Sequence, residues 1–289
     1  MTQGGQSMRK VENMKRKRQD IAVGLVVPVV AIAIWQWVAV HGWVNEHVLP
    51  SPLQVWRKWI AYLLPLQDFA VYQENEGGGR LAWALSGDLI HDSLGSLYRV
   101  VVGFAVGAGL GLPLGLAMGA SRIVYGWMNP LMQLLRPIPP IAYIPLSMLW
   151  FGLGNAPAIF LIALGAFFPV LMNTIAGVRQ VDGIYLRAAR NLGAGGPTLF
   201  LRVILPAAVP YILTGVRIGI GTAFIVVIVS EMIAVNNGLG FRILEAREYF
   251  KSDQIIAGMI TIGILGLAID AGVNKLNNYL LRWHRGLEH

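Results

Sequence analysis

The chain has 289 residues, of which 55% are hydrophobic and 13% charged, and its formal net charge is +8. Soluble domains carry about 25% charged residues, so this composition excludes a water-exposed globule and favours a chain whose solvent is the lipid bilayer. The sequence contains no cysteine, which excludes a disulfide framework and thiolate chemistry.

The N-terminal region combines a basic tail with a first apolar segment. Residues 1–20 are polar and hold six Lys and Arg, and residues 21–40 are almost wholly apolar. About 20 such residues cross a hydrocarbon core of about 30 Å. The segment is a full span long without a small-x-small cleavage site, so we expect a retained helix rather than a signal peptide. The basic tail is predicted to stay in the cytoplasm.

Residues 41–92 are mixed in character and are predicted to lie outside. Leu49-Pro50-Ser51-Pro52 reads as a stiff turn, and residues 53–66 as an interfacial amphipathic helix bearing Trp56 and Trp59. Residues 74–79 read as a flexible polar loop, and the longer stretch 66–90 has no assigned role.

A second span is predicted over residues 93–119, where glycine recurs at every fourth position. Such a row lets a neighbouring helix backbone approach closely, so tight helix packing is expected. The five positions are Gly103, Gly107, Gly111, Gly115 and Gly119.

The third predicted span, 127–151, contains Arg136-Pro137-Ile138-Pro139-Pro140 and then Pro145. Proline removes a backbone donor and breaks a helix, so this crossing should be interrupted and should face protein or a watery cavity. Three more spans are expected at 156–178, 207–235 and 254–281. The sequence therefore predicts an all-α, polytopic membrane protein with about six transmembrane helices.

The distribution of basic residues agrees with six spans and two cytoplasmic termini. Fourteen of the 23 Lys and Arg fall in segments predicted to be inside, and six in segments predicted to be outside. This placement also explains the net charge without nucleic acid, because the aromatic and basic platform of single-strand binders is absent from the sequence.

Residues 179–206 are predicted to form a cytoplasmic loop that contacts a partner. Asp182 opens a short helix, a Gly-rich stretch stops it at 193–196, and Pro197 opens a second short helix. Small side chains on the first helix suit docking into a groove. The candidate residues are Tyr185, Arg187, Ala188, Ala189, Arg190, Leu192, Gly193, Leu205 and Pro206.

The pattern Ala188-Ala189, then Gly193, then Ile204-Leu205-Pro206 resembles the EAA loop of ABC importer permeases. The first position of that motif is commonly Glu, whereas this chain has Arg187 and so lacks a carboxylate there. Further segments resemble the taurine/sulfonate/nitrate branch of this family, from about residue 49 to the C-terminus. They are Leu49-Pro50-Ser51-Pro52, Arg136-Pro137-Ile138-Pro139-Pro140, Trp150-Phe151-Gly152-Leu153-Gly154, Glu231-Met232-Ile233-Ala234 and Gly238-Leu239-Gly240-Phe241.

The resemblance implies the type I importer (MetI-like) permease fold and a location in the bacterial inner membrane. It also implies a second permease copy, with a homodimer suggested by this branch, two cytoplasmic ABC ATPase subunits and a periplasmic substrate-binding protein. The cargo would be a small solute of the taurine, alkyl sulfonate or nitrate class. Because the sequence has no G-x-x-x-x-G-K-[ST] phosphate loop, ATP and Mg²⁺ are expected on the partner subunits, with no cofactor and no catalysis on this chain.

Charged and kinked positions inside the spans are candidates for the translocation pathway or a gate. A charge at membrane depth costs roughly 2.5–3.5 kcal/mol on insertion scales, so each needs a reason. The alternative is structural: an arginine paired with Glu231, or a side chain that reaches the interface. The residues concerned are Arg136, Pro137, Pro139, Pro140, Arg217 and Glu231.

Three other classes of protein compete with this interpretation. A secondary transporter or channel works without an ATPase and often has paired broken helices, but the sequence offers one broken segment, at 136–145. A membrane enzyme needs convergent catalytic groups, and the sequence has no HExxH motif and no clustered carboxylates within its spans. A scaffold leaves the loop at 179–206 unexplained.

The predicted organisation has four parts. They are a cytoplasmic tail at 1–20, a first helix with an external segment at 21–92, a permease core at 93–281, and a C-terminal tail at 282–289 whose last residues resemble a tag remnant.

Overall fold

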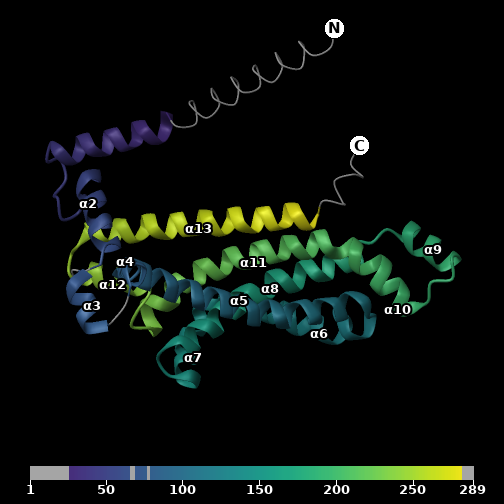
Figure 1. Cartoon of the computed structure of the whole chain (residues 1–289). Coiled ribbons are helices and arrows are strands. Elements are labelled where there is room, and N and C mark those ends of the chain that lie inside the picture. The colour runs from purple at the N-terminus through teal and green to yellow at the C-terminus, as the bar shows by residue number, and fades with distance from the viewer. Residues whose placement is uncertain (1–25, 66–68, 77–78, 282–289) are drawn as a thin grey trace, which may run out of the picture. The chain divides into compact units, whose positions relative to one another are not determined.

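The computed structural model describes residues 26–65, 69–76 and 79–281, and within these ranges it contains helices and no β-strand (Figure 1). The basic tail at 1–20 and the C-terminal tail at 282–289 lie outside the described residues. After a helix at Val26–Val40, the elements are α2 Pro52–Leu63, α3 Phe69–Glu76, α4 Arg80–Ala84, α5 Asp88–Ala120, α6 Arg122–Leu135, η1 Pro140–Tyr143, α7 Ile144–Phe151, α8 Asn155–Arg179, α9 Gly183–Asn191, α10 Gly196–Leu199, η2 Phe200–Ile204, α11 Leu205–Ala234, α12 Leu239–Glu248 and α13 Ser252–Leu280.

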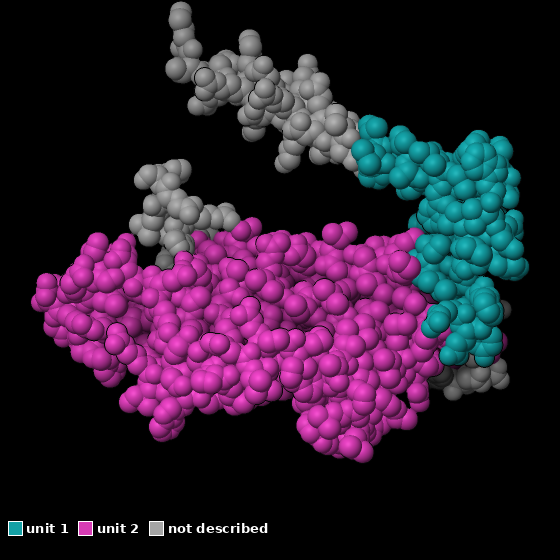
Figure 2. All heavy atoms as spheres, turned by 180° about the vertical axis from the view of Figure 1, so that it is seen from behind, with its two compact units in different colours: residues 1–61, 246–257 teal, residues 62–245, 258–289 magenta. Residues whose placement is uncertain are grey.

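The chain divides into two compact units, coloured separately in Figure 2. The smaller unit comprises residues 1–61 and 246–257. Within it, the Trp35 indole donates a hydrogen bond to the Pro50 carbonyl at 3.0 Å, and the Ser252 hydroxyl donates to the His47 carbonyl. The larger unit comprises residues 62–245 and 258–289 and holds the features discussed below.

Four helices of the described chain are long and apolar enough to cross a membrane: Asp88–Ala120, Asn155–Arg179, Gly196–Ala234 and Ser252–Leu280. They correspond to four of the six predicted spans. The helix at Val26–Val40 and the segment Pro140–Phe151 are shorter apolar stretches. The predicted polar loop at 74–79 is wrong in its first half, because α3 continues to Glu76.

The third predicted span is interrupted, as its prolines indicated. Helix α6 ends at Leu135, and the chain turns through Pro137 and Pro139 before η1 and α7 continue. Neither piece alone is long enough to span a bilayer. Proline supplies no backbone N–H and fixes its own φ, so three prolines in four residues make a continuous helix impossible at this point.

The predicted glycine row lies in the contact between α5 and α8. A Cβ atom added at Gly107 would lie 2.3 Å from the Ala163 carbonyl oxygen, and one at Gly119 would lie 2.6 Å from the Val178 Cβ. Gly103 faces Ile162 in the same way. Tight helix packing is therefore confirmed, because any larger side chain would force the two backbones apart.

The order of these contacts shows that α5 and α8 run in the same direction. The segment from α6 to α7 must therefore return the chain from the end of α5 to the start of α8. Helix α8 also packs against α11 and is the most buried span of the four. Ala166 of α8 and Val227 of α11 belong to one buried apolar cluster.

Candidate functional site: the α9 surface and two buried polar clusters

Helix α9 is bounded by local signals at both ends. The Asp182 side chain accepts a hydrogen bond from the Ile184 N–H at 2.9 Å, which satisfies a donor at the start of the helix. At the other end Gly193 has φ +83°, and its N–H donates to the Arg190 carbonyl at 2.9 Å. Glycine adopts this left-handed conformation without a steric cost, so it stops the helix. The predicted helix and stop are both present.

The side chains of α9 form an exposed apolar surface. No residue of this helix is buried, and Ile184, Tyr185 and Leu192 are 61%, 63% and 89% exposed. With 3.6 residues per turn, Ile184, Ala188 and Leu192 share one helix face. Tyr185 and Ala189 flank that face, and Arg187 and Arg190 lie on the other side by the same spacing. Figure 1 shows α9 beyond the ends of α8 and α11.

The segment after α9 differs from the prediction of a separate second short helix. Helix α10, with Pro197 in its first turn, continues through the π-helical turn η2 into α11. The Leu205 N–H donates to the Phe200 carbonyl in a five-residue step. Pro206 has no N–H to donate to the preceding turn, which accounts for the widened turn at this point. Leu205 and Pro206 thus form the first turn of α11 rather than part of a loop.

The opposite end of the bundle contains a buried polar group, here called the Arg99 cluster. Arg99 of α5 and Glu231 of α11 form an ion pair at 2.5 Å, and their side chains are 2% and 0% exposed. Arg99 also donates to the Asn155 side chain at 2.7 Å and to the Asn237 carbonyl at 3.2 Å. Glu231 accepts from the Ser96 hydroxyl at 2.8 Å and the Gly240 N–H at 2.9 Å.

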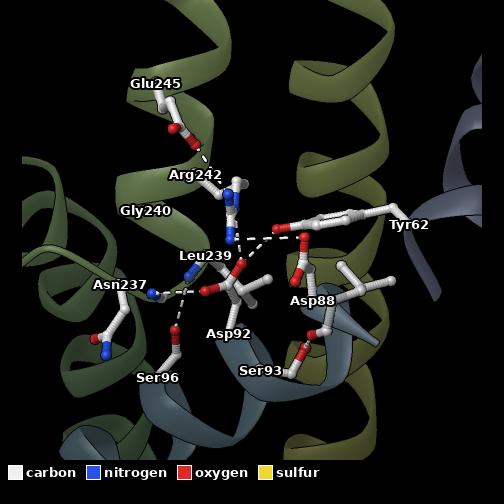
Figure 3. Close-up of polar contacts among 12 residues, drawn as sticks. Tyr62, Asp88, Asp92, Ser93, Ser96, Asn237, Leu239, Gly240, Arg242 and Glu245 are labelled. Carbon is white, nitrogen blue, oxygen red and sulfur yellow. Dashed lines mark hydrogen bonds and ion pairs between the residues drawn. The ribbon is translucent and has the colours of Figure 1, made fainter. Parts of the chain in front are cut away.

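Figure 3 shows a neighbouring group, the Asp92 cluster, in which three donors converge on the Asp92 carboxylate. The Arg242 Nε and the Gly238 N–H donate to it at 2.9 and 3.0 Å, and the Tyr62 hydroxyl donates as well. Burial, together with the neighbouring Asp92 carboxylate, raises the pKa of Tyr62. Burial alone would lower the pKa of Arg242, but its ion pair with Asp92 outweighs that effect and raises it.

The two clusters tie the start of α5 to the end of α11 and to the turn before α12. Their carboxylates and guanidinium groups are hydrogen-bonded on several sides, as buried charges must be. Gly238, with φ +105°, allows the turn to pass so close that an added Cβ would lie 2.6 Å from both Arg99 Nη1 and Glu231 Cδ. The arrangement links these three segments through buried hydrogen bonds and ion pairs.

The structure gives the predicted pathway residues different environments. Glu231 pairs with an arginine, as the structural alternative expected, and that arginine is Arg99. Arg217 instead pairs with Asp270 of α13 at 3.0 Å, with both side chains half exposed. Arg136 is exposed at the end of α6, where Pro137, Pro139 and Pro140 form the break before α7. These residues are not gathered into one site.

Sequence reasoning missed Arg99 and Asp92 as partners. The signal available was that each is a charged residue inside or beside an apolar span, like Glu231. In the described part of the chain, no group of three His, Cys, Asp or Glu side chains is placed to hold a metal ion.

Comparison with known proteins gives a consistent result. Residues 109–285 match the family model described as binding-protein-dependent transport system inner membrane component. The putative aliphatic sulfonates transport permease protein of Bacillus subtilis is 37% identical over 273 residues, with 94% of this chain and 91% of that protein covered. The taurine transport system permease protein of Escherichia coli is 34% identical, with 92% and 91% covered. The nitrate import permease protein of Synechocystis is 35% identical, with 89% and 90% covered.

Among solved structures, the fold is similar to a chain of the MetNI methionine ABC transporter in inward-facing conformations. The TM-score is 0.60 at 18% sequence identity, and the match covers 68% of this chain and 97% of that one. At this identity the likeness concerns the fold, which agrees with the MetI-like permease fold expected from the sequence.

Proposed function

Because the chain belongs to the family of binding-protein-dependent transport system inner membrane components, we propose that it is the permease subunit of an ATP-driven importer for a small anion. Three relatives are named for aliphatic sulfonates, taurine and nitrate. Aliphatic sulfonates and taurine carry a sulfonate group, and nitrate is itself an oxyanion. A periplasmic binding protein would deliver the solute, and two ATPase subunits would supply the energy to a pair of permease subunits.

The proposal places the α9 end of the bundle in the cytoplasm. Arginines gather in the segments at this end, and basic residues in short loops favour the cytoplasmic side. The residues concerned are Arg122, Arg179, Arg187, Arg190 and Arg202. The Arg99 and Asp92 clusters would then lie at the periplasmic end, and both termini would be cytoplasmic.

The observation that carries the proposal is the exposed apolar surface of α9. None of the residues of this short helix is buried within the chain itself. Burying apolar area on a partner contributes about 25 cal/mol per Å², so Ile184, Tyr185 and Leu192 are suited to a groove on a cytoplasmic ATPase subunit. Arg187, where related loops commonly have Glu, would give this contact the opposite charge.

The connections of α9 supply a route for coupling. It follows α8 after a short turn and is joined by residues 192–195 to α10, from which the helical backbone continues through η2 into α11. A displacement of α9 would therefore reach the α9 ends of both α8 and α11. The Arg99 and Asp92 clusters would make the opposite ends move together, as rocking between two access states requires.

The coupling role is tested by adding charge to the α9 surface in a system that contains the ATPase and the binding protein. Ala189→Glu and Gly193→Asp should leave the permease in the membrane but abolish uptake and the substrate-stimulated part of ATP hydrolysis. Thr198→Glu adds the same charge at an exposed position of α10 and serves as the control. Normal uptake in both α9 variants would sink the coupling role.

The pathway role proposed for Arg136 and Arg217 is tested separately. Asp270 balances the charge of Arg217, whereas Arg136 is exposed without a carboxylate partner in the described part of the chain. Arg136→Ala should reduce uptake while assembly and basal ATP hydrolysis stay normal. Failed assembly would instead support a structural role for this arginine. Uptake by the chain in the absence of any ATPase would favour the secondary-transporter alternative.

A further inference from the structure

A cavity of about 500 Å³ opens where α5 ends, α6 begins and α8 ends. Its lining consists of Gly119, Ala120, Arg122, Tyr125 and Arg179. Two of these five residues carry a guanidinium group and none carries a carboxylate. The lining therefore has the charge of a site for an anion.

Arg179 is held in place at the wall of this cavity. Its guanidinium carbon lies 3.4 Å from the centroid of the Tyr125 ring, and its Nη2 donates to the Met118 carbonyl at 3.4 Å. Stacking on an aromatic ring orients a guanidinium without neutralising it. The remaining N–H groups keep their charge and their capacity to donate.

Arg122 has an electrostatic environment that a helix alone would not favour. It is the first residue of α6, whose first turn contains no acidic side chain. The start of a helix carries a partial positive charge, which is stabilised by an anion and not by an arginine. Among the described residues, the ion pairs of arginine involve Arg99, Arg217 and Arg242, and neither arginine of the cavity has one.

The cavity lies at the level of a membrane surface. It sits at the ends of two helices that are long and apolar enough to span the bilayer. On α6, Ile123 and Trp127 are 69% and 80% exposed, and tryptophan at a span end is typical of the lipid headgroup region. Basic pockets between spans on the cytoplasmic side are suited to anionic lipid headgroups.

We propose that this cavity binds the phosphate group of an anionic phospholipid from the cytoplasmic leaflet. Arg122 and Arg179 would donate to the phosphate oxygens, since guanidinium groups match phosphate geometry. The bound headgroup would hold the end of α5, the start of α6 and the end of α8 together. This inference rests on the proposed function for one point, the cytoplasmic orientation of the α9 end.

The test is native mass spectrometry of the purified full-length permease in detergent, with phosphatidylglycerol or phosphatidylcholine added. The wild type should retain phosphatidylglycerol in preference to phosphatidylcholine, whose headgroup is neutral overall. Replacing both arginines by R122Q and R179Q should weaken retention about tenfold or more. The double variant R187Q and R190Q removes the same charge on α9 and should retain the lipid normally.

Three outcomes would overturn the proposal. They are equal retention of the two lipids, equal weakening in both double variants, and competition by millimolar inorganic phosphate at the same arginines. The last result would assign the cavity to free phosphate. If R122Q/R179Q fails to fold, the single variant R122Q replaces it in the test, because the Arg122 side chain has no ion pair to lose. Lipid retention is measured without the ATPase, so a negative result leaves the proposed coupling role of α9 untouched. In the same way, failure of the α9 test would leave the lipid measurement valid.

Discussion

Substituting Asp92 by Asn tests whether the buried clusters hold one end of the bundle together. The new side chain has the same shape but no charge, and one of its two terminal atoms becomes a donor. Three donors converge on the native carboxylate, from Tyr62, Gly238 and Arg242. In the variant an amide N–H would face a donor, and Arg242 would lose its nearest counter-charge.

The size of the effect follows from burial. Asp92 is 1% exposed, and removing one partner of a buried ion pair costs about 3–5 kcal/mol. We expect about 3 kcal/mol, because Arg242 is partly exposed and keeps Glu245 at 3.0 Å. Asp88 is the matched control: it lies one turn earlier on α5, is 39% exposed and is 4.0 Å from Arg242. An exposed pair contributes below about 1 kcal/mol.

The assay is unfolding of the purified permease in detergent, followed by circular dichroism. D92N should unfold at a clearly lower temperature or denaturant concentration than the wild type, and D88N should unfold close to it. Equal losses of stability in the two variants would refute the argument from burial. Unchanged stability in D92N would refute the claim that the Asp92 cluster holds this end of the bundle together.

Two further predictions concern packing and pH. Gly107→Ala should destabilise the protein by about 1–3 kcal/mol, because the added Cβ would meet Ala163. Gly109→Ala is the control and should leave stability unchanged, because a Cβ added there has no atom within 4 Å. Similar unfolding midpoints for the two variants would argue against the close contact of α5 and α8. The pKa of Tyr62 is raised in the folded state, so its contribution to stability is complete below the ordinary tyrosine pKa of about 10 and falls as pH rises beyond it. Tyr62→Phe should flatten the loss of stability between about pH 9 and 11, and an unchanged slope would contradict the buried setting of this hydroxyl.

Features encoded by neighbouring residues could be predicted from the sequence. The start of α9 at Asp182, its stop at Gly193 and the break after Arg136 depend on the conformational preferences of single residues. The close helix packing along residues 103–119 followed from a periodic row of glycines, and the structure identifies α8 as the partner helix. Helix α3 was missed because the polar residues before Gly77 have no apolar periodicity that would indicate a helix.

The polar clusters could not be predicted in the same way. Arg99 and Glu231 are 132 residues apart in the chain, and Asp92 and Arg242 are 150 apart. Which charged residue meets which is decided by how the spans pack, and one sequence contains no signal for that pairing. The same reason explains why the sequence indicated an arginine as a partner for Glu231 without identifying Arg99.

The central claim is that α9 is where another subunit's ATP cycle acts on this chain. Because the sequence has no cysteine, Leu192→Cys provides a unique thiol on the exposed surface of α9. With the ATPase subunit and a short thiol-reactive cross-linker, this variant should form a permease–ATPase adduct whose yield changes when ATP is bound. Absence of the adduct in an active importer, with an adduct formed instead from Thr198→Cys on α10, would contradict the account.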